Sequence, residues 1–300
     1  MVNPDEPGIG AGAPANLVTL SDGRILSYAQ YGDGGGAPLF YFHGLPGSRL
    51  EAQLTRSSAA ALGLRVIALD RPGFGYSDFS PRRTLLDWPA DVAQVANSLG
   101  IERFSVLGVS GGGPYALACA YRLADRLRAV GVVCGLGPLD GPGAVESMAW
   151  FPRVTFGMAR RAPVAGKLTL VNFVGPLLAT SPRRFLSMLR KRLPVPDRAV
   201  LSRRRVINVL CASLAEGLRA GSRGAWYDVH LLSHAWGFDV RAIDFPVQLW
   251  HGGRDAVVPV AMGHRQAQAM VNCCGRFLPN DGHYSLPINH VREILTQLIG

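Results

Sequence analysis

The sequence has no long uninterrupted hydrophobic run. No apolar stretch approaches the roughly 20 residues that a membrane-spanning helix needs, which excludes a transmembrane segment. Residues 1–15 contain acids and prolines and lack the apolar core of a signal peptide. We therefore expect a flexible segment over residues 1–15, a cytoplasmic location and no more than surface contact with a membrane.

Cysteine is also scarce. The chain has five cysteines, an odd number without the spacing of a metal site, and most lie within apolar segments. They are Cys119, Cys134, Cys211, Cys273 and Cys274. We expect reduced core cysteines, with neither a disulfide framework nor a bound metal.

Acidic residues are nearly missing from residues 151–205, which hold thirteen Lys or Arg residues and a single acid, Asp197. The net charge of +10 therefore originates in this one segment. Neither a recognition motif nor interleaved aromatic residues accompany the charge, so we expect no nucleic-acid partner. Solvated surface is the expected role of these side chains, with contact to an anionic substrate or a membrane surface as the alternatives.

Elsewhere, short apolar runs alternate with helix-length amphipathic segments. Residues 16–32 contain a hairpin signal at Ser21-Asp22-Gly23. Buried parallel strands are predicted at 38–44, 64–70, 104–110, 127–135 and 245–252, with helices such as 84–100 between them. This alternation is typical of an α/β fold with a mostly parallel, doubly wound sheet.

The strand rhythm stops near Gly137 and resumes near Ile243, and the intervening residues are helical in pattern and basic. We therefore predict a core formed by residues 16–136 and 243–300, interrupted by a helical cap at residues 137–242. Within the cap, residues 183–193 place apolar side chains on one helical side, which we expect to cover the functional site.

One predicted strand ends abruptly in a serine among glycines: residues 106–115 read VLGVSGGGPY. A strand, the G-x-S-x-G pattern and a helix in succession are typical of a nucleophile elbow, whose sharp turn requires neighbours without side chains. Such a turn aims the hydroxyl of Ser110 into a cleft above a helix N-terminus, where developing negative charge is stabilised.

A serine hydroxyl needs a base, and the base needs a carboxylate to orient it. Asp255 and His283 both follow apolar strands, in the chain order that an elbow serine requires. His290 lies where the last helix begins and is the weaker candidate for the base. Asp140, after the preceding strand, is a rival acid.

Acyl chemistry also needs donors for an oxyanion. The backbone amides of Leu45, in YFHGLPGSR, and of Gly111 are the expected pair. Structural roles are expected for a further set of polar residues at strand ends: His43, Asp70, Arg71 and His251. His230 and His234, near the end of the cap, are candidates to line the pocket.

Five segments, taken in chain order, resemble motifs of a known family: HGLPGSR, LDRPGFGYSD, GVSGGGPYALA, HGGRDAVVP and GHYSL. Over residues 16–300 the chain resembles the α/β-hydrolase superfamily, in particular its serine esterase and peptidase-like branch with an HG-x-P motif. The resemblance implies Ser110 as nucleophile, Asp255 as acid, His283 as base and the amides of Leu45 and Gly111 as oxyanion donors. A serine at the elbow differs from the aspartate of haloalkane dehalogenases and epoxide hydrolases.

The function that these residues favour is hydrolysis of an ester, thioester, lactone or amide through an acyl-enzyme, without a cofactor. We expect a hydrophobic small-molecule substrate, because the cap offers apolar residues for a pocket lining. These are Phe156, Met158, Phe173, Leu177, Phe185 and Met188. A proline-type aminopeptidase, a carbon–carbon bond hydrolase, an acyltransferase and a non-catalytic ligand receptor are the alternatives. The oligomeric state is not indicated by the sequence.

Overall fold

The structure is a computed structural model that describes residues 15–139 and 144–299. Its centre is an eight-stranded sheet with the strand order β1-β2-β4-β3-β5-β6-β7-β8. The pairs β1–β2 and β2–β4 are antiparallel and the other neighbouring pairs are parallel. The strands are β1 (Asn16–Thr19), β2 (Ile25–Gly32), β3 (Ala37–Phe42), β4 (Leu64–Leu69), β5 (Phe104–Val109), β6 (Leu127–Val133), β7 (Val247–Gly252) and β8 (Cys273–Leu278). The predicted hairpin, strands and mostly parallel sheet are confirmed, whereas the segment predicted to be flexible lies outside the described residues except for Ala15.

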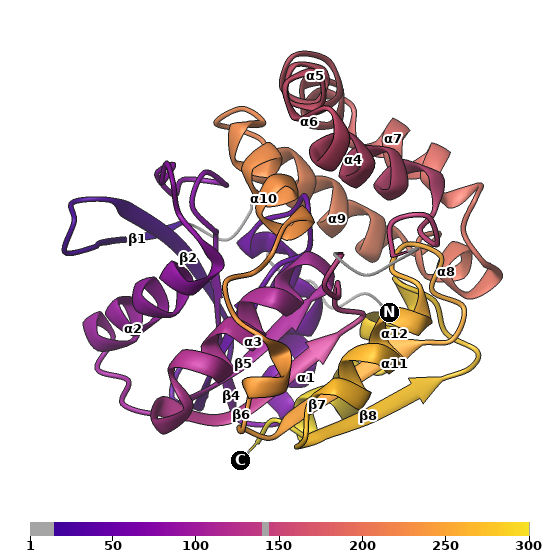
Figure 1. The fold of residues 1–300 in the computed structure, drawn as a ribbon. Coiled ribbons are helices and arrows are strands. Elements are labelled where there is room, and N and C mark those ends of the chain that lie inside the picture. The colour runs from indigo at the N-terminus through magenta and orange to yellow at the C-terminus, as the bar shows by residue number, and fades with distance from the viewer. Residues whose placement is uncertain (1–14, 140–143, 300) are drawn as a thin grey trace.

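Helices cover both faces of the sheet (Figure 1). Because successive strand residues point to opposite faces, Phe40 and Phe42 of β3 join one hydrophobic core while Leu39 and Tyr41 join the other. The first core includes α2 (Trp88–Ser98), α3 (Gly113–Arg122) and α11 (Val260–Ala269), and the second includes α1 (Arg56–Ala61) and α13 (Val291–Thr296). Burial on both faces explains why the strands read as continuous apolar runs.

A group of helices lies between β6 and β7 in the chain and above one edge of the sheet (Figure 1). They are α4 (Trp150–Arg161), α5 (Pro163–Thr169), α6 (Gly175–Thr180), α7 (Pro182–Arg190), α8 (Val195–Val200), α9 (Arg204–Gly217) and α10 (Arg223–Ser233). We call α4–α10 the cap; the boundaries 137 and 242 stay a prediction. Among the described residues no single helix is long and apolar enough to span a membrane. The segments Pro163–Thr180 and Pro182–Arg190 meet the length and hydropathy criteria only when they are taken together, and they are bent by 93° relative to one another.

Buried ion pairs fasten the cap to the core. Asp228 of α10 accepts hydrogen bonds from the guanidinium groups of Arg71, at 2.8 Å, and Arg83, at 2.6 Å. The Tyr115 hydroxyl of α3 donates to the same carboxylate at 2.6 Å. All four residues are nearly inaccessible to solvent, so the cap supplies the charge that neutralises two buried arginines of the core.

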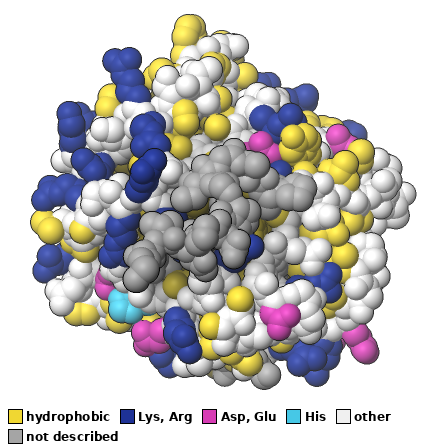
Figure 2. Space-filling view, turned by 180° about the vertical axis from the view of Figure 1, so that it is seen from behind, with side chains coloured by type: hydrophobic (Ala, Val, Ile, Leu, Met, Phe, Trp, Pro, Cys, Tyr) yellow, Lys and Arg dark blue, Asp and Glu magenta, His cyan; other side chains and the backbone are white. Residues whose placement is uncertain are grey.

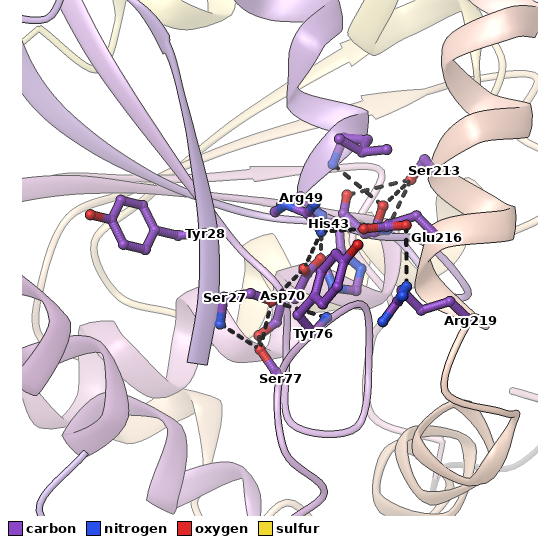
Figure 3. A network of polar contacts seen from close by, with 12 residues as sticks. Ser27, Tyr28, His43, Arg49, Asp70, Tyr76, Ser77, Ser213, Glu216 and Arg219 are labelled. Carbon is purple, nitrogen blue, oxygen red and sulfur yellow. Dashed lines mark hydrogen bonds and ion pairs between the residues drawn. The ribbon is translucent and has the colours of Figure 1, made fainter. Parts of the chain in front are cut away.

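A second network joins α9 to the core around Arg49 (Figure 3). The Arg49 guanidinium lies 2.7 Å from a carboxylate oxygen of Asp70, which follows β4, and 2.8 Å from one of Glu216 in α9. Ser27 of β2 donates a further hydrogen bond to Asp70 at 2.7 Å. Asp70 is therefore part of the contact between the cap and the core. Both Asp70 and Arg71 lie in structural ion pairs.

Candidate active site

Ser110 directly follows β5 and opens a 3₁₀ turn that leads into α3. Its φ is +55°, in the left-handed region where a side chain is strained. Glycine neighbours permit the turn, because a Cβ atom on Gly108 would lie 2.3 Å from the Gly112 carbonyl oxygen, and one on Gly112 would lie 2.1 Å from that of Phe42. The chain thus forms the sharp strand-to-helix turn that the glycine pattern predicts.

The structure brings together the three side chains predicted to form a catalytic group. The Nε2 atom of His283 lies 3.0 Å from the Oγ atom of Ser110, and its Nδ1 atom lies 2.8 Å from Oδ2 of Asp255. The three residues follow β5, β7 and β8, whose carboxyl ends meet at one edge of the sheet. The geometry is that of a hydroxyl, an imidazole that can take its proton, and a carboxylate that orients the imidazole.

The carboxylate of Asp255 is held ionised. Its Oδ1 atom accepts hydrogen bonds of 2.8 Å from the backbone amides of Val257 and Val258. Burial by itself would raise the pKa of Asp255, but the charges and hydrogen bonds of His283 and His251 outweigh burial and hold that pKa well below its usual range. A charged Asp255 fixes the imidazole of His283 with Nδ1–H toward the acid and Nε2 toward the serine.

His283 itself has a raised pKa. Burial opposes the charged imidazolium, yet the nearby negative charge of Asp255, with smaller contributions from Asp197 and Glu51, raises the pKa of His283 above its ordinary value of 6.5. An imidazole that binds a proton more readily is suited to take one from Ser110 and to return it to a leaving group.

Asp197, the single acid of the basic segment, holds the loop that carries His283. Its carboxylate accepts backbone hydrogen bonds from His283 at 3.0 Å, Tyr284 at 3.0 Å and Ser285 at 2.8 Å. A Cβ atom on Gly282 would lie 2.4 Å from the same carboxylate, so glycine is required there. The side chain is fully buried. Sequence reasoning missed this contact, although an isolated acid among thirteen basic residues was the available signal.

Glu51 is a second buried carboxylate near Ser110 that the sequence did not reveal. The Tyr41 hydroxyl donates to Glu51 Oε1 at 2.7 Å, and the Gly44 amide donates to both carboxylate oxygens at 3.1 and 3.2 Å. Burial raises the pKa of Glu51. The remaining exposure of its side chain is toward the cavity described next, which it lines.

Leu45 and Gly111 lie beside Ser110 in the same wall. A Cβ atom on Gly111 would lie 3.4 Å from the Leu45 backbone nitrogen, so the two peptide segments are adjacent. Both residues line the cavity, as does Ser110. Their position is that expected of two amides that donate to an oxyanion, and this role stays a prediction.

A cavity of about 210 Å³ extends from Ser110 and His283 between the cap and the core. Its cap wall includes side chains of α4, α6 and α7, namely Phe151, Phe156, Leu178, Phe185, Leu186 and Leu189. The core wall includes Val109, Val133 and Leu295. No Lys, Arg or Asp side chain is among the described residues that line the cavity, so the lining is apolar apart from a few groups around Ser110.

The predicted cap lining is only partly right. Phe156 and Phe185 line the cavity, but Phe173, Leu177 and Met188 are exposed by 73%, 50% and 50% and lie outside it, and Met158 is not among its lining residues. For Phe173 and Leu177 the reason is a π-helical turn at Leu170–Val174, which adds a residue to one turn and shifts the inward side chains by one position. Met158 and Met188 lie in other helices, α4 and α7. His230 and His234 also lie outside the lining, against one another with ring centroids 4.4 Å apart.

The other histidines have structural partners. His43 is buried with Nδ1 2.8 Å from the Gly44 carbonyl oxygen, and His251 is buried with Nε2 2.9 Å from the Val258 carbonyl oxygen. His290 lies 3.0 Å from a carboxylate oxygen of Asp281 instead of facing Ser110. The rival acid, Asp140, lies outside the described residues.

One group of side chains has donors that could hold a metal ion. Ligand atoms of Cys134, Asp255 and His283 lie within 4.8 Å of one another. Asp255 and His283 are already hydrogen-bonded to one another, and burial raises the pKa of the Cys134 thiol well above its usual value, which disfavours the thiolate that a metal would need. This donor set therefore fits a metal poorly. The five cysteines of the described chain are free.

The chain is similar to known proteins over most of its length. The dihydrolipoyllysine-residue acetyltransferase component of the acetoin cleaving system of Pseudomonas putida is 28% identical over 91% of this chain, which spans only 65% of that protein's length. A non-heme haloperoxidase of Rhodococcus erythropolis is 28% identical over 91% of this chain and 94% of its own length. Among solved structures, an esterase from Thermogutta terrifontis superimposes with a TM-score of 0.67 at 22% identity, covering 96% of this chain and all of the esterase.

The family assignment rests on the match of a family model to most of the chain. Residues 37–287 match the model described as the alpha/beta hydrolase fold, which includes β3, the strand that precedes Ser110, the cap and the loop of His283. The sheet order and the inserted helices agree with this match. The chain therefore belongs to the α/β-hydrolase family of enzymes.

Proposed function

We propose that this protein is a serine hydrolase that cleaves an ester, thioester, lactone or amide of a hydrophobic small molecule. The observation that carries the proposal is the hydrogen-bonded series Ser110–His283–Asp255 at an apolar cavity. The esterase and haloperoxidase relatives support hydrolytic chemistry on this fold. A cytoplasmic location, supported by the free cysteines, is part of the same proposal.

The mechanism follows from the positions of the side chains. His283 takes the proton of Ser110 as the oxygen attacks the acyl carbon, and Asp255 stabilises the imidazolium that forms. The amides of Leu45 and Gly111 stabilise the negative oxygen of the tetrahedral intermediate. His283 then protonates the leaving group, and water attacks the acyl-enzyme by the same proton transfers in reverse.

The cavity lining indicates the substrate class. Aromatic and aliphatic side chains of the cap favour an apolar acyl or aryl group, which loses contact with water as it enters. Because no Lys or Arg is among the described lining residues, the basic charge of the cap does not select an anionic substrate inside the cavity. The one acid among the described lining residues, Glu51, belongs to the core, so the cap supplies no carboxylate to the lining, which argues against a cap that binds the free amine of a proline-type aminopeptidase substrate.

A labelling experiment and a substrate series test the proposal. A fluorophosphonate probe is expected to label the wild-type protein and the variant Ser202→Ala, whose serine is exposed, but not Ser110→Ala. For p-nitrophenyl esters from acetyl to hexanoyl, kcat/KM should rise by about two decades, since each of the four added methylenes contributes about 0.8 kcal/mol when buried. Absence of labelling, or faster turnover of amino-acyl arylamides than of all esters, would overturn the proposal. Product analysis with added alcohol separates hydrolysis from acyl transfer, the reaction suggested by the acetyltransferase relative.

A further inference from the structure

Exposed hydrophobic side chains are concentrated on the cap. Of the thirteen large hydrophobic residues that the described chain exposes, eight lie between residues 150 and 195. They are Trp150, Val154, Val164, Leu168, Phe173, Leu177, Met188 and Val195. Each is at least half exposed, and exposed apolar side chains gathered in one segment indicate an interaction surface.

Four of these residues form one row along α5, the π-helical turn and α6. Val164 and Leu168 are one helical turn apart, and Phe173 and Leu177 are also one turn apart. The five-residue step from Leu168 to Phe173 crosses the π-helical turn, where the extra residue keeps both side chains on the same side. The opposite side of these helices lines the cavity with Leu170, Gly175 and Leu178. We call Val164, Leu168, Phe173 and Leu177 the outer row.

Basic side chains flank both ends of the outer row. Arg160 and Arg161 are exposed just before α5, and Lys167 is exposed in its last turn. Arg183 and Arg184 are exposed at the start of α7. In Figure 2, Lys and Arg side chains gather on the side of the molecule where the cap lies, beside hydrophobic side chains at the top. The one acid within residues 151–205 is the buried Asp197, and the exposed Glu146 next to this segment pairs with Arg161, so the remaining surface charge of the segment is positive.

We infer that the outer row and its flanking basic residues form a docking surface for an anionic lipid membrane. Apolar side chains that enter the boundary of headgroups and acyl chains, with Lys and Arg beside them, are the chemistry of interfacial membrane binding. Charge decides against a second copy of the chain, which would bring like charges together. The inference goes beyond the proposed hydrolysis, and it places the helices that line the cavity directly against the lipid.

The binding test uses the full chain and vesicles, without a substrate. Wild-type protein should sediment with vesicles of phosphatidylcholine and phosphatidylglycerol, should bind vesicles of phosphatidylcholine alone at least about tenfold more weakly, and should dissociate with added salt. The variant Phe173→Glu/Leu177→Glu should lose roughly a hundredfold in affinity. The matched control Leu17→Glu/Val271→Glu adds the same charge at residues exposed by 56% and 81% outside the cap, and it should bind as the wild type does.

A second pair of variants tests the charge. Lys167→Ala/Arg184→Ala should weaken binding to the anionic vesicles at least about tenfold, whereas Arg128→Ala/Arg292→Ala, at exposed positions outside the cap, should not. Circular dichroism should show that each variant is folded, because the substituted side chains are exposed. Absence of wild-type binding, or equal losses in the cap variants and their controls, overturns the inference. Concentration-dependent dimerisation that Phe173→Glu/Leu177→Glu abolishes would assign the surface to a second copy instead.

Discussion

Removal of one negative charge in the cap is expected to disturb His283, the proposed catalytic base. The carboxylate of Asp197 forms no hydrogen bond with the three predicted catalytic side chains. It accepts hydrogen bonds from the backbone amides of His283 and the next two residues. In Asp197→Asn the side chain keeps its shape, while its NH₂ group must face at least one of those donors and its charge is lost. The loop that positions His283 should then lose part of its support.

The hydrogen bonds set the magnitude. A hydrogen bond to a charged group contributes about 1.5–3 kcal/mol, and a buried donor left without an acceptor costs about 1–3 kcal/mol. We therefore expect Asp197→Asn to lower the free energy of unfolding by about 2–4 kcal/mol and Asp197→Ala by about 3–5 kcal/mol. Urea denaturation measures both losses.

The assay must separate positioning from a smaller folded fraction. Titration with a fluorophosphonate counts the active sites, so that kcat is expressed per site. Because the charge of Asp197 helps to raise the pKa of His283, its loss should lower that pKa and move the acid limb of kcat/KM to lower pH. We also expect kcat per site to fall while KM changes little, since Asp197 is not among the residues that line the cavity.

The control is Asp239→Asn, which removes an exposed acid that pairs with Arg241. It should leave stability, kcat and the pH profile of the wild type nearly unchanged. If Asp197→Asn loses stability but keeps kcat per site and the acid limb of the wild type, Asp197 supports the fold alone and the positioning argument is wrong.

The remaining predictions concern the catalytic group and the contact between cap and core. Ester turnover should fall at least about a thousandfold, with little change in stability, in each of the variants Ser110→Ala, Asp255→Asn and His283→Ala. Near-normal turnover of Asp255→Asn together with an inactive Asp140→Asn would show that the acid is misassigned. The acid limb of kcat/KM should have its midpoint above pH 6.5, because the base must be neutral and the pKa of His283 is raised; a midpoint below this value contradicts the cause given for the shift. Asp228→Asn should cost about 3–5 kcal/mol in urea denaturation, since it leaves two buried arginines short of a counter-charge, and a loss under about 1 kcal/mol would mean that they are otherwise compensated.

The sheet and the juxtaposition of Ser110, Asp255 and His283 were predictable from the sequence. Strands buried on both faces leave continuous apolar runs, and Ser110 directly follows one such run, while Asp255 and His283 follow β7 and β8 after a few loop residues. Because the strands are parallel, their carboxyl ends meet at one edge, and residues distant in the chain become neighbours. This inference needs only strand order and direction, not the packing of side chains.

The contacts of the cap were not predictable in the same way. Phe173 and Leu177 were expected in the lining because they are apolar, but their outward orientation depends on one π-helical turn that the sequence does not reveal. The role of Asp197 depends on how α8 packs against the loop that carries His283. Glu51 can be identified as a site residue only from its hydrogen bond with the backbone amide of Gly44, which the sequence does not reveal. Hydrophobic periodicity contains no information on either docking contact.

The hydrogen bonds between Asp197 and the His283 loop have a consequence for synthesis of the chain. They join residues 86 positions apart, so at roughly 5–20 residues per second the ribosome adds the partners of Asp197 about 4–17 s after Asp197 itself. β7 and β8 are added during that interval and the histidine only at its end, so until then the carboxylate lacks its backbone partners. The nascent cap must therefore wait for the loop that follows the last strand, and docking of α8 and completion of the proposed catalytic group become a single late step of folding.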